Sequence, residues 1–391
     1  MDFKTAALST VRGTYPGHIP YAPRFDLWFN AHDYRGTFPD EYRDCGSPLD
    51  IARKIGVGGH CVIADFIRPD DPSEVIDRGI GLYSLPQFPY RCFLPGVERR
   101  VTRYDDTTEV AYRTPKGTVT VGYTLTEDMR RAGASISQIT KHALIGEKDI
   151  PPLAWLFEHV EVVPDYTGLD RMIDGAGGDA LVVANVSLPG SPMQFIMRDL
   201  MDVTSFFFAT ADYPEKLRYL SDAIGIYFEK IMDIGVLCPS DILLFGANTD
   251  ETITYPPFYE ENIMPWIARF ASAAHQRGKF VLIHADGENR GLFDLYRQSG
   301  IDILEAVATS PMTKCAIREV LERADGMTVW GGIPSVILMP ETFGVEAFEA
   351  YMHDTLDAVG SRPQFILGVS DTTPPDADFA RLIRIGGMVK E

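Results

Sequence analysis

The second half of the chain alternates short apolar runs with longer amphipathic stretches, and this alternation constrains the fold more than any other feature. Short apolar strands that alternate with helices are typical of a parallel sheet covered on both faces. Six strand–helix pairs follow one another from residue 178 to the end of the chain. The predicted strands are 179–187, 241–248, 280–287, 301–309, 327–335 and 364–372, and the predicted helices are 212–235, 257–278, 290–300, 311–326, 340–360 and 374–387.

Two further strands are expected near the N-terminus, at 23–31 and 59–66. A helix between them begins at Ser47-Pro48, where proline suits the first helical position, and ends at Gly56. Eight parallel strands joined by helices predict a (β/α)₈ barrel, the TIM-barrel fold. The evenly spaced series favours this barrel over a doubly wound open sheet.

The alternation is interrupted between the second and third predicted strands. Residues 97–125 alternate polar and apolar positions in three runs joined by short turns, which predicts an antiparallel β-meander. Residues 150–165 predict a helix that ends at a proline. We therefore expect one domain over residues 1–391, in which 67–177 form an inserted cap.

Composition excludes several classes of function. A net charge of −19 and a pI near 4.8 argue against binding to nucleic acid or to an anionic membrane surface, since both need a basic face. The sequence contains no apolar run long enough to span a bilayer and no secretory signal. The five cysteines are scattered and form no CxxC pair, so we expect neither a disulfide framework nor a thiolate zinc knuckle. Scattered free cysteines suit a reducing compartment, and we therefore expect a cytoplasmic location.

The carboxyl ends of the strands are where a barrel of this kind carries its chemistry. Polar residues at the predicted ends are Asn30, His32, Asp65, Asn185, Ser187, Asn248, Asp250, His284, Asp286, Glu305, Ser335, Ser370 and Asp371. His284 and Asp286 lie two residues apart on one strand and therefore point to the same side. Glu305 lies inside the apolar run ILEAVA, where a carboxylate needs a partner or a metal.

Two kinds of site agree with these residues. His284, Asp286, Glu305 and Asp371 offer one nitrogen and several oxygens, enough to hold a divalent metal. The same groups also suit an acid–base cluster whose members shift one another's pKa values. The simplest structural alternative is a core histidine held by a carboxylate, with the other polar residues capping helices or lying in exposed loops.

At these residues the chain resembles the uroporphyrinogen decarboxylase superfamily, which also contains the corrinoid-dependent methyltransferases that demethylate methanol, methylamines and methoxylated compounds. The resemblance runs from about residue 20 to 385 and is greatest from 236 to 376. The methyltransferase branch carries His-x-Cys at the end of strand five and a cysteine after strand eight, before a Pro-Pro turn, and these groups bind zinc. Here His284-Ala-Asp286 stands in place of His-x-Cys, and Asp371 in GVSDTTPPDAD stands in place of the later cysteine.

The resemblance to the decarboxylases themselves is carried by other residues. The ADF segment around Asp65 is similar to the segment that holds their substrate-side aspartate, and Arg35 lies near the position of a basic residue that binds an anionic substrate. A porphyrinogen with several carboxylates needs several arginines at the mouth. Arg24, Arg35 and Arg43 are available, but the later strand ends are acidic, which disfavours a porphyrinogen as the first choice.

The resemblance therefore implies a methyltransferase of a corrinoid-dependent demethylation system, with metal-independent decarboxylation of a porphyrinogen-type carboxylate as the alternative. A barrel that binds a ligand without catalysis is the third reading. We expect His284, Asp286, Glu305 and Asp371 to bind the metal, for which zinc is the first choice. Catalytic roles are expected for His284, Asp286, Glu305 and Asp65, and substrate-binding roles for Arg24, Arg35, Asn248, Asp250 and Ser335. A small methylated substrate and a partner protein that supplies the corrinoid (cobalamin) are the expected partners, and the sequence leaves a homodimer open.

Overall fold

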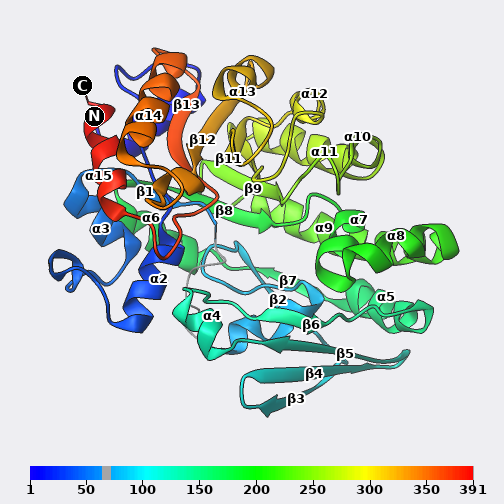
Figure 1. Ribbon diagram of the computed structural model, residues 1–391. Helices are drawn as coiled ribbons and strands as arrows, with labels where there is room; N and C mark the ends of the chain where they lie inside the picture. The colour runs from blue at the N-terminus through cyan, green and yellow to red at the C-terminus, as the bar shows by residue number, and fades with distance from the viewer. Residues whose placement is uncertain (64–71, 391) are drawn as a thin grey trace.

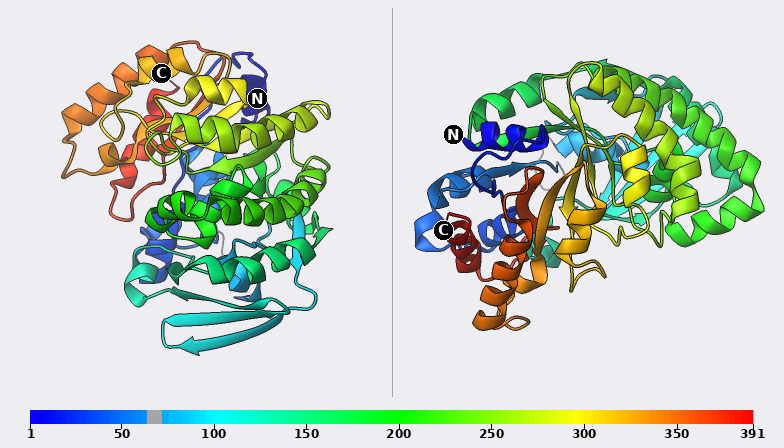
Figure 2. Two further views of the ribbon diagram at one scale, coloured as in Figure 1. Left: turned by 90° about the vertical axis from the view of Figure 1, so that its right-hand side faces the viewer. Right: turned by 90° about the horizontal axis from the view of Figure 1, so that it is seen from above.

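The computed structural model describes residues 1–63 and 72–390, and within them the chain forms a curled parallel sheet with helices on its outer face (Figure 1, Figure 2). The sheet has seven strands in the order β1-β8-β9-β10-β11-β12-β13. Their bounds are β1 Gly59–Cys61, β8 Ala180–Ser187, β9 Ile242–Ala247, β10 Phe280–His284, β11 Ile303–Val307, β12 Thr328–Pro334 and β13 Phe365–Ser370. Every residue of β8, β9, β11, β12 and β13 is buried, as expected for parallel strands covered on both faces.

The helices that connect and cover these strands are mostly those predicted. They are α1 Phe3–Val11, α2 Asp26–Arg35, α3 Pro48–Ile55, α5 Ile150–His159, α6 Thr167–Ala176, α9 Pro214–Gly235, α11 Met264–His275, α12 Phe293–Gln298, α13 Ile317–Arg323, α14 Val345–Val359 and α15 Phe379–Met388. Short helices α7 Pro192–Phe195, α8 Val203–Asp212 and α10 Pro256–Phe258 lie near the carboxyl ends of β8 and β9. Helix α3 begins and ends as predicted, since the Ser47 side chain accepts from the Asp50 amide and Gly56 closes the helix at φ +71°.

The predicted first strand, 23–31, is wrong. These residues begin helix α2 instead, because Phe25, Trp28 and Phe29 follow helical spacing and bury one face. Phe379 of α15 stacks on Trp28, with ring centroids 4.2 Å apart. The chain just before α2 occupies the eighth position: Tyr21 bridges Leu367 of β13 in parallel and its carbonyl accepts from the amide of Gly58, directly before β1. This contact is an isolated bridge, so the described sheet is barrel-like with seven full strands.

The meander predicted at 97–125 is present. Strands β3 Glu98–Tyr104, β4 Thr107–Thr114 and β5 Gly117–Thr124 pair antiparallel, and β6 Gln138–Lys141 joins their edge after the short helix α4 Glu127–Arg131. This second sheet lies at the bottom of Figure 1, on the opposite side of the molecule from α13 and α14. Assignment of the whole segment 67–177 to an inserted cap stays a prediction.

Several predicted helices are shorter than expected, and three of them differ from the structure for a local reason. The helix expected at 150–165 ends at His159, and its β-branched tail becomes β7 Glu161–Pro164, which pairs with β2 Tyr90–Phe93. The helix expected at 257–278 is interrupted by a π-helical turn, Tyr259–Ile263. The helix expected at 311–326 starts only at Ile317, because the residues after Pro311 form a loop. The backbone amide of Ser310 donates a hydrogen bond to the carbonyl of Cys315 and closes this loop. Among the helices of the described ranges, none has both the length and the apolar character needed to cross a membrane.

Candidate functional site

The site is organised around two neighbouring strands whose register brings a histidine and a glutamate together. His284, the last residue of β10, is the register partner of Glu305 in β11. Partners on adjacent strands point to the same face, which is here the inside of the curled sheet. The Nδ1 atom of His284 lies 2.5 Å from Oε2 of Glu305, and both side chains are almost completely buried.

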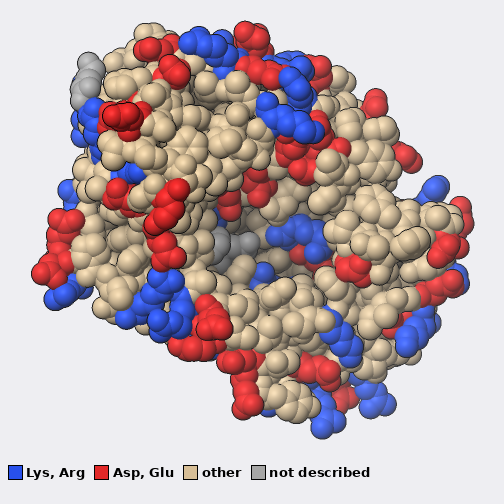
Figure 3. Space-filling model, viewed as in Figure 1, with Lys and Arg blue, Asp and Glu red and all other residues tan. Residues whose placement is uncertain are grey.

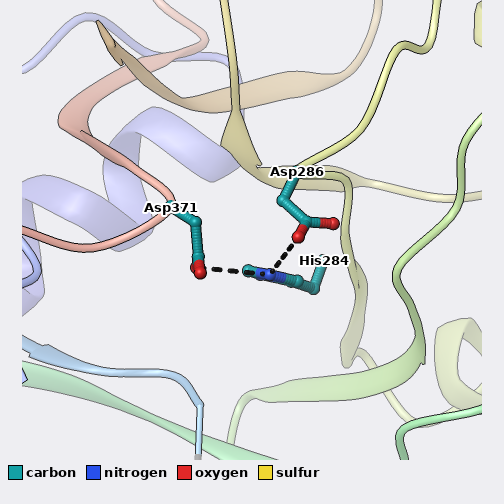
Figure 4. Close-up of side chains that lie close together, drawn as sticks. All are labelled: His284, Asp286 and Asp371. Atoms are coloured by element: carbon teal, nitrogen blue, oxygen red, sulfur yellow. Dashed lines mark ion pairs between the residues drawn. The ribbon is translucent and has the colours of Figure 1, made fainter. Parts of the chain in front are cut away.

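Two aspartates lie at the other nitrogen of the same imidazole. Nε2 of His284 is 3.6 Å from Oδ2 of Asp286 and 3.4 Å from Oδ1 of Asp371 (Figure 4). Potential ligand atoms of the three residues all lie within 4.8 Å of one another. Figure 4 shows the imidazole edge directed at both carboxylates, which come from the ends of different strands. We call His284, Asp286 and Asp371 the three-residue cluster.

Charge and burial within this group shift three pKa values. Burial disfavours the charged form of His284, but the carboxylates of Glu305 and Asp286 outweigh it and raise its pKa well above the ordinary 6.5. Burial likewise opposes ionisation of Glu305, yet His284 and His60 hold the pKa of Glu305 below its ordinary value of 4.5. For Asp286, burial raises the pKa and the neighbouring His284 lowers it, and the net pKa is below 3.8. Glu305 and Asp286 are therefore carboxylates at neutral pH.

Each member of the cluster is held by a different neighbour. Glu305 holds His284, as described. The Asn248 side-chain amide donates to Asp286 over 3.3 Å, and Asn248 itself sits directly after β9 in the left-handed region, with φ +54°. Arg24, which is 2% exposed, forms an ion pair with Asp371 and a second one with Asp26 over 3.4 Å. The structure thus places Arg24 and Asn248, both predicted from the sequence, in direct contact with the cluster.

The remaining predicted residues lie elsewhere or have other contacts. Arg35 donates to the Arg131 carbonyl and pairs with the exposed Asp376. The Asp250 carboxylate accepts from the amides of Thr252 and Glu288 and so holds two loops together. The Ser335 hydroxyl contacts the sulfur of Met312, and Asp65 lies outside the described residues. Binding of substrate by Arg24, Arg35, Asn248, Asp250 or Ser335 stays a prediction, as does a catalytic role of Asp65.

The sequence reasoning missed two polar residues that the structure adds to this group. His60 of β1 places Nε2 2.9 Å from Oε1 of Glu305, so that both oxygens of this glutamate are engaged by imidazoles. Arg198 donates from Nε to the side-chain oxygen of Asn248 over 3.2 Å. A signal for His60 was present, since it stands in the apolar run GHCVIADF much as Glu305 stands in ILEAVA.

The structure has a hollow on one face and a separate cavity between helices and strand β1. The face shown in Figure 3 is hollowed between the parallel sheet and the β3–β6 sheet, and acidic and basic side chains line the walls of the hollow. A cavity of about 660 Å³ is lined by residues of α2, α3, β1 and α6. Its lining includes His60 and Asp26, the residues that contact Glu305 and Arg24. The volume is in the range that small-molecule sites occupy, about 300–1,000 Å³.

The protein has a barrel-like α/β fold with an imidazole–carboxylate cluster at the carboxyl ends of its strands. In (β/α)₈ barrels this end of the strands is the usual place of the active site. The model of the uroporphyrinogen decarboxylase (URO-D) family matches residues 165–391, more than half of the chain, and the chain belongs to this family. This confirms the resemblance noted in the sequence.

Comparison with solved structures supports the fold. A methyltransferase from Methanosarcina mazei superposes with a TM-score of 0.55 at 12% identity, covering 100% of this chain and 98% of that chain. A dipeptide epimerase from Methylococcus capsulatus, complexed with Mg ion, matches 71% of this chain and 89% of its own at 10% identity, but its TM-score of 0.15 carries no argument. No curated protein sequence matches the chain.

Proposed function

We propose that this protein is the methyltransferase component of a corrinoid-dependent demethylation system. It moves a methyl group between a small methylated compound, or a corrinoid protein, and an acceptor, with the help of a divalent metal. Membership of the URO-D family and the fold shared with a methyltransferase support this proposal. The observation that carries it is the three-residue cluster and the separate support given to each of its members.

The donor set of the cluster fits a metal. It offers one imidazole nitrogen and two carboxylate oxygens, which suit zinc and other borderline or hard divalent ions. Ligands about 2.0–2.1 Å from a tetrahedral ion lie about 3.3 Å apart. The observed separations of 3.4 and 3.6 Å between His284 and the two aspartates are close to this spacing. His284, Asp286 and Asp371 would therefore hold the ion, and Glu305, with both oxygens engaged by imidazoles, supports His284 from behind.

The chain's own residues prepare this site for binding. Glu305 accepts from Nδ1 of His284, so that Nε2, once it has lost its proton, directs its lone pair at the aspartates. Asn248 and Arg24 fix the carboxylates of Asp286 and Asp371. A metal held there acts as a Lewis acid, which lowers the pKa of a thiol acceptor or polarises the group that carries the methyl. A small substrate fits the cavity whose lining includes His60, the residue that contacts Glu305.

Metal binding is the first test. The purified protein is stripped with a chelator and titrated with zinc, alongside His284→Ala and His275→Ala. His275 pairs with Asp302 over 2.8 Å near the end of α11 and provides a matched control that lies apart from the cluster. We expect stoichiometric zinc in the wild type and the control, and loss of binding in His284→Ala. A wild type that binds no divalent metal would remove the Lewis-acid role.

The second test separates methyl transfer from decarboxylation. The metal-loaded protein is mixed with methylcobalamin and a thiol. Transfer of the methyl group from cobalt to sulfur is followed by the change in absorbance of the cobalamin. We expect turnover that depends on His284 and on metal. Turnover of a porphyrinogen by metal-free protein, without any methyl transfer, would instead establish the decarboxylase alternative.

A further inference from the structure

His60 and Glu305 meet across the inside of the curled sheet. They belong to β1 and β11, and three strands, β8, β9 and β10, separate these two in the sheet. The contact therefore does not follow from strand pairing and requires both side chains to reach into the interior. His60 Nε2 lies 2.9 Å from Glu305 Oε1, at side-chain exposures of 5% and 1%.

This contact completes the hydrogen bonding of Glu305. Its other oxygen is 2.5 Å from Nδ1 of His284. A carboxylate only accepts hydrogen bonds, so each imidazole must donate an N–H to it. When His284 donates from Nδ1, its free lone pair is on Nε2, the nitrogen that faces Asp286 and Asp371. Glu305 can hold this tautomer only while its own carboxylate keeps its orientation.

Trp330 fixes the ring of His60 in turn. The two rings pack edge to face, with centroids 5.5 Å apart at an angle of 71°, and Trp330 is 1% exposed. His60 is thus held by an indole on one side and by a carboxylate at Nε2. In a buried site, loss of such a donor leaves a carboxylate oxygen without its partner, and the carboxylate then reorients.

We propose that His60 is a positioning residue for the metal site. It holds one oxygen of Glu305 so that the other keeps His284 in the Nδ1–H tautomer, with Nε2 directed at Asp286 and Asp371. The inference rests on the metal site of the proposed function and extends it to the opposite wall of the sheet. Because His60 acts through Glu305, its contribution must disappear when the carboxylate is removed.

Zinc affinity tests this dependence. The metal-stripped wild type, His60→Leu, which lacks a donor, and His60→Gln, which keeps a terminal N–H, are titrated with zinc against a chromophoric chelator, with His275→Ala as control. We expect His60→Leu to weaken binding about 10–100-fold, the usual effect of losing a group that orients a ligand. His60→Gln should recover most of this loss, and His275→Ala should bind as the wild type does. Equal affinity in the wild type and His60→Leu would overturn the proposal.

The same substitution in the Glu305→Gln background supplies a readout that a purely structural role would not give. There His60→Leu should change zinc affinity less than threefold, since the carboxylate through which it acts is gone. An equal loss in both backgrounds would show that His60 acts by general destabilisation. If His60→Leu folds poorly alone, His60→Phe, which also lacks a donor but keeps an aromatic ring against Trp330, replaces it in both backgrounds.

Ring-nitrogen NMR of metal-free, ¹⁵N-histidine-labelled protein tests the geometry without zinc, at a pH high enough to leave His284 as a neutral imidazole. The His284 resonances, assigned with His284→Ala, should report the Nδ1–H tautomer in the wild type and in His60→Gln, and a mixture of tautomers in His60→Leu. An unchanged spectrum in His60→Leu would overturn the inference. If the wild type binds no zinc, the metal role fails by itself, and this spectrum alone decides the role of His60.

Discussion

Oε2 of Glu305 lies 2.5 Å from Nδ1 of His284 and faces it in register from the neighbouring strand. This pairing determines which nitrogen of His284 faces the two aspartates. It also places a carboxylate that is 1% exposed next to two imidazoles, so its charge is matched inside the sheet.

Replacement of Glu305 by glutamine should weaken zinc binding about 10–100-fold, because an amide orients and polarises the imidazole less well than a carboxylate does. Competition with a chelator of known affinity measures the effect. Asp302→Asn is the matched control, since Asp302 also accepts from a histidine, His275, over 2.8 Å near the end of α11. Equal losses in both variants would contradict a specific role of Glu305.

Stability of the metal-free protein should depend on pH in two directions. The pKa of Glu305 is lower in the folded protein than its value of 4.5 in the unfolded chain. Ionised Glu305 therefore stabilises the fold above pH 4.5, and this contribution is lost as the pH falls. The pKa of His284 is higher in the folded protein than its value of 6.5 in the unfolded chain. Protonated His284 therefore stabilises the fold below pH 6.5, and this contribution is lost as the pH rises through the pKa of the folded state. The pair therefore contributes most between pH 4.5 and 6.5.

Guanidinium unfolding of chelator-treated protein, measured from acid to mildly alkaline pH, checks this dependence. Glu305→Gln should flatten the profile on both sides, because it removes the charge that both shifts depend on. A variant whose profile matches that of the wild type would show that other groups control the pH dependence.

Conversion of Asp286 and Asp371 to cysteine should change the metal preference. The double variant introduces thiolates at the positions where the resemblance to the methyltransferase branch places cysteines, and thiolates favour softer ions than carboxylates do. We expect the ratio of zinc to manganese affinity to rise at least tenfold over the wild type, measured by parallel titrations. An unchanged ratio would mean that these two positions are not ligands.

Arg24→Gln should destabilise the protein by about 1.5–3 kcal/mol, since it removes a buried guanidinium bonded to charged partners. Arg24 is 2% exposed and pairs with Asp26 and Asp371. Arg35→Gln is the control: its partner Asp376 is 76% exposed, so the loss should stay within about 1 kcal/mol. Chemical denaturation at neutral pH compares the two, and similar losses would contradict the buried role of Arg24.

Most of the parallel sheet could be predicted from the sequence, because strands buried on both faces are continuous apolar runs with turn signals at each end. The first strand was wrong because FDLWFNA is apolar at positions that suit either structure, and the deciding contact with Phe379 comes from the far end of the chain. Helical spacing of Phe25, Trp28 and Phe29, with Gly36 closing the helix at φ +64°, was the local signal for α2.

The residues of the candidate site can be predicted from the sequence to a similar extent. His284, Asp286, Glu305 and Asp371 can be selected because strand ends meet at one edge of a sheet, and the structure places the three carboxylates around the imidazole of His284. The role of each residue within the site cannot be predicted from the sequence, because it depends on which carboxylate oxygen faces which imidazole nitrogen. His60 reaches Glu305 across three intervening strands, and no local pattern encodes a contact between residues 245 positions apart.

The ion pair between Arg24 and Asp371 joins residues 347 positions apart in the chain. During synthesis, Arg24, His284 and Asp286 leave the ribosome before Asp371 does. A nascent chain that has just passed Asp286 therefore contains the guanidinium partner but not the second aspartate of the cluster. The cluster can close only after residue 371 has emerged, so its assembly follows the synthesis of all seven strands of the described parallel sheet.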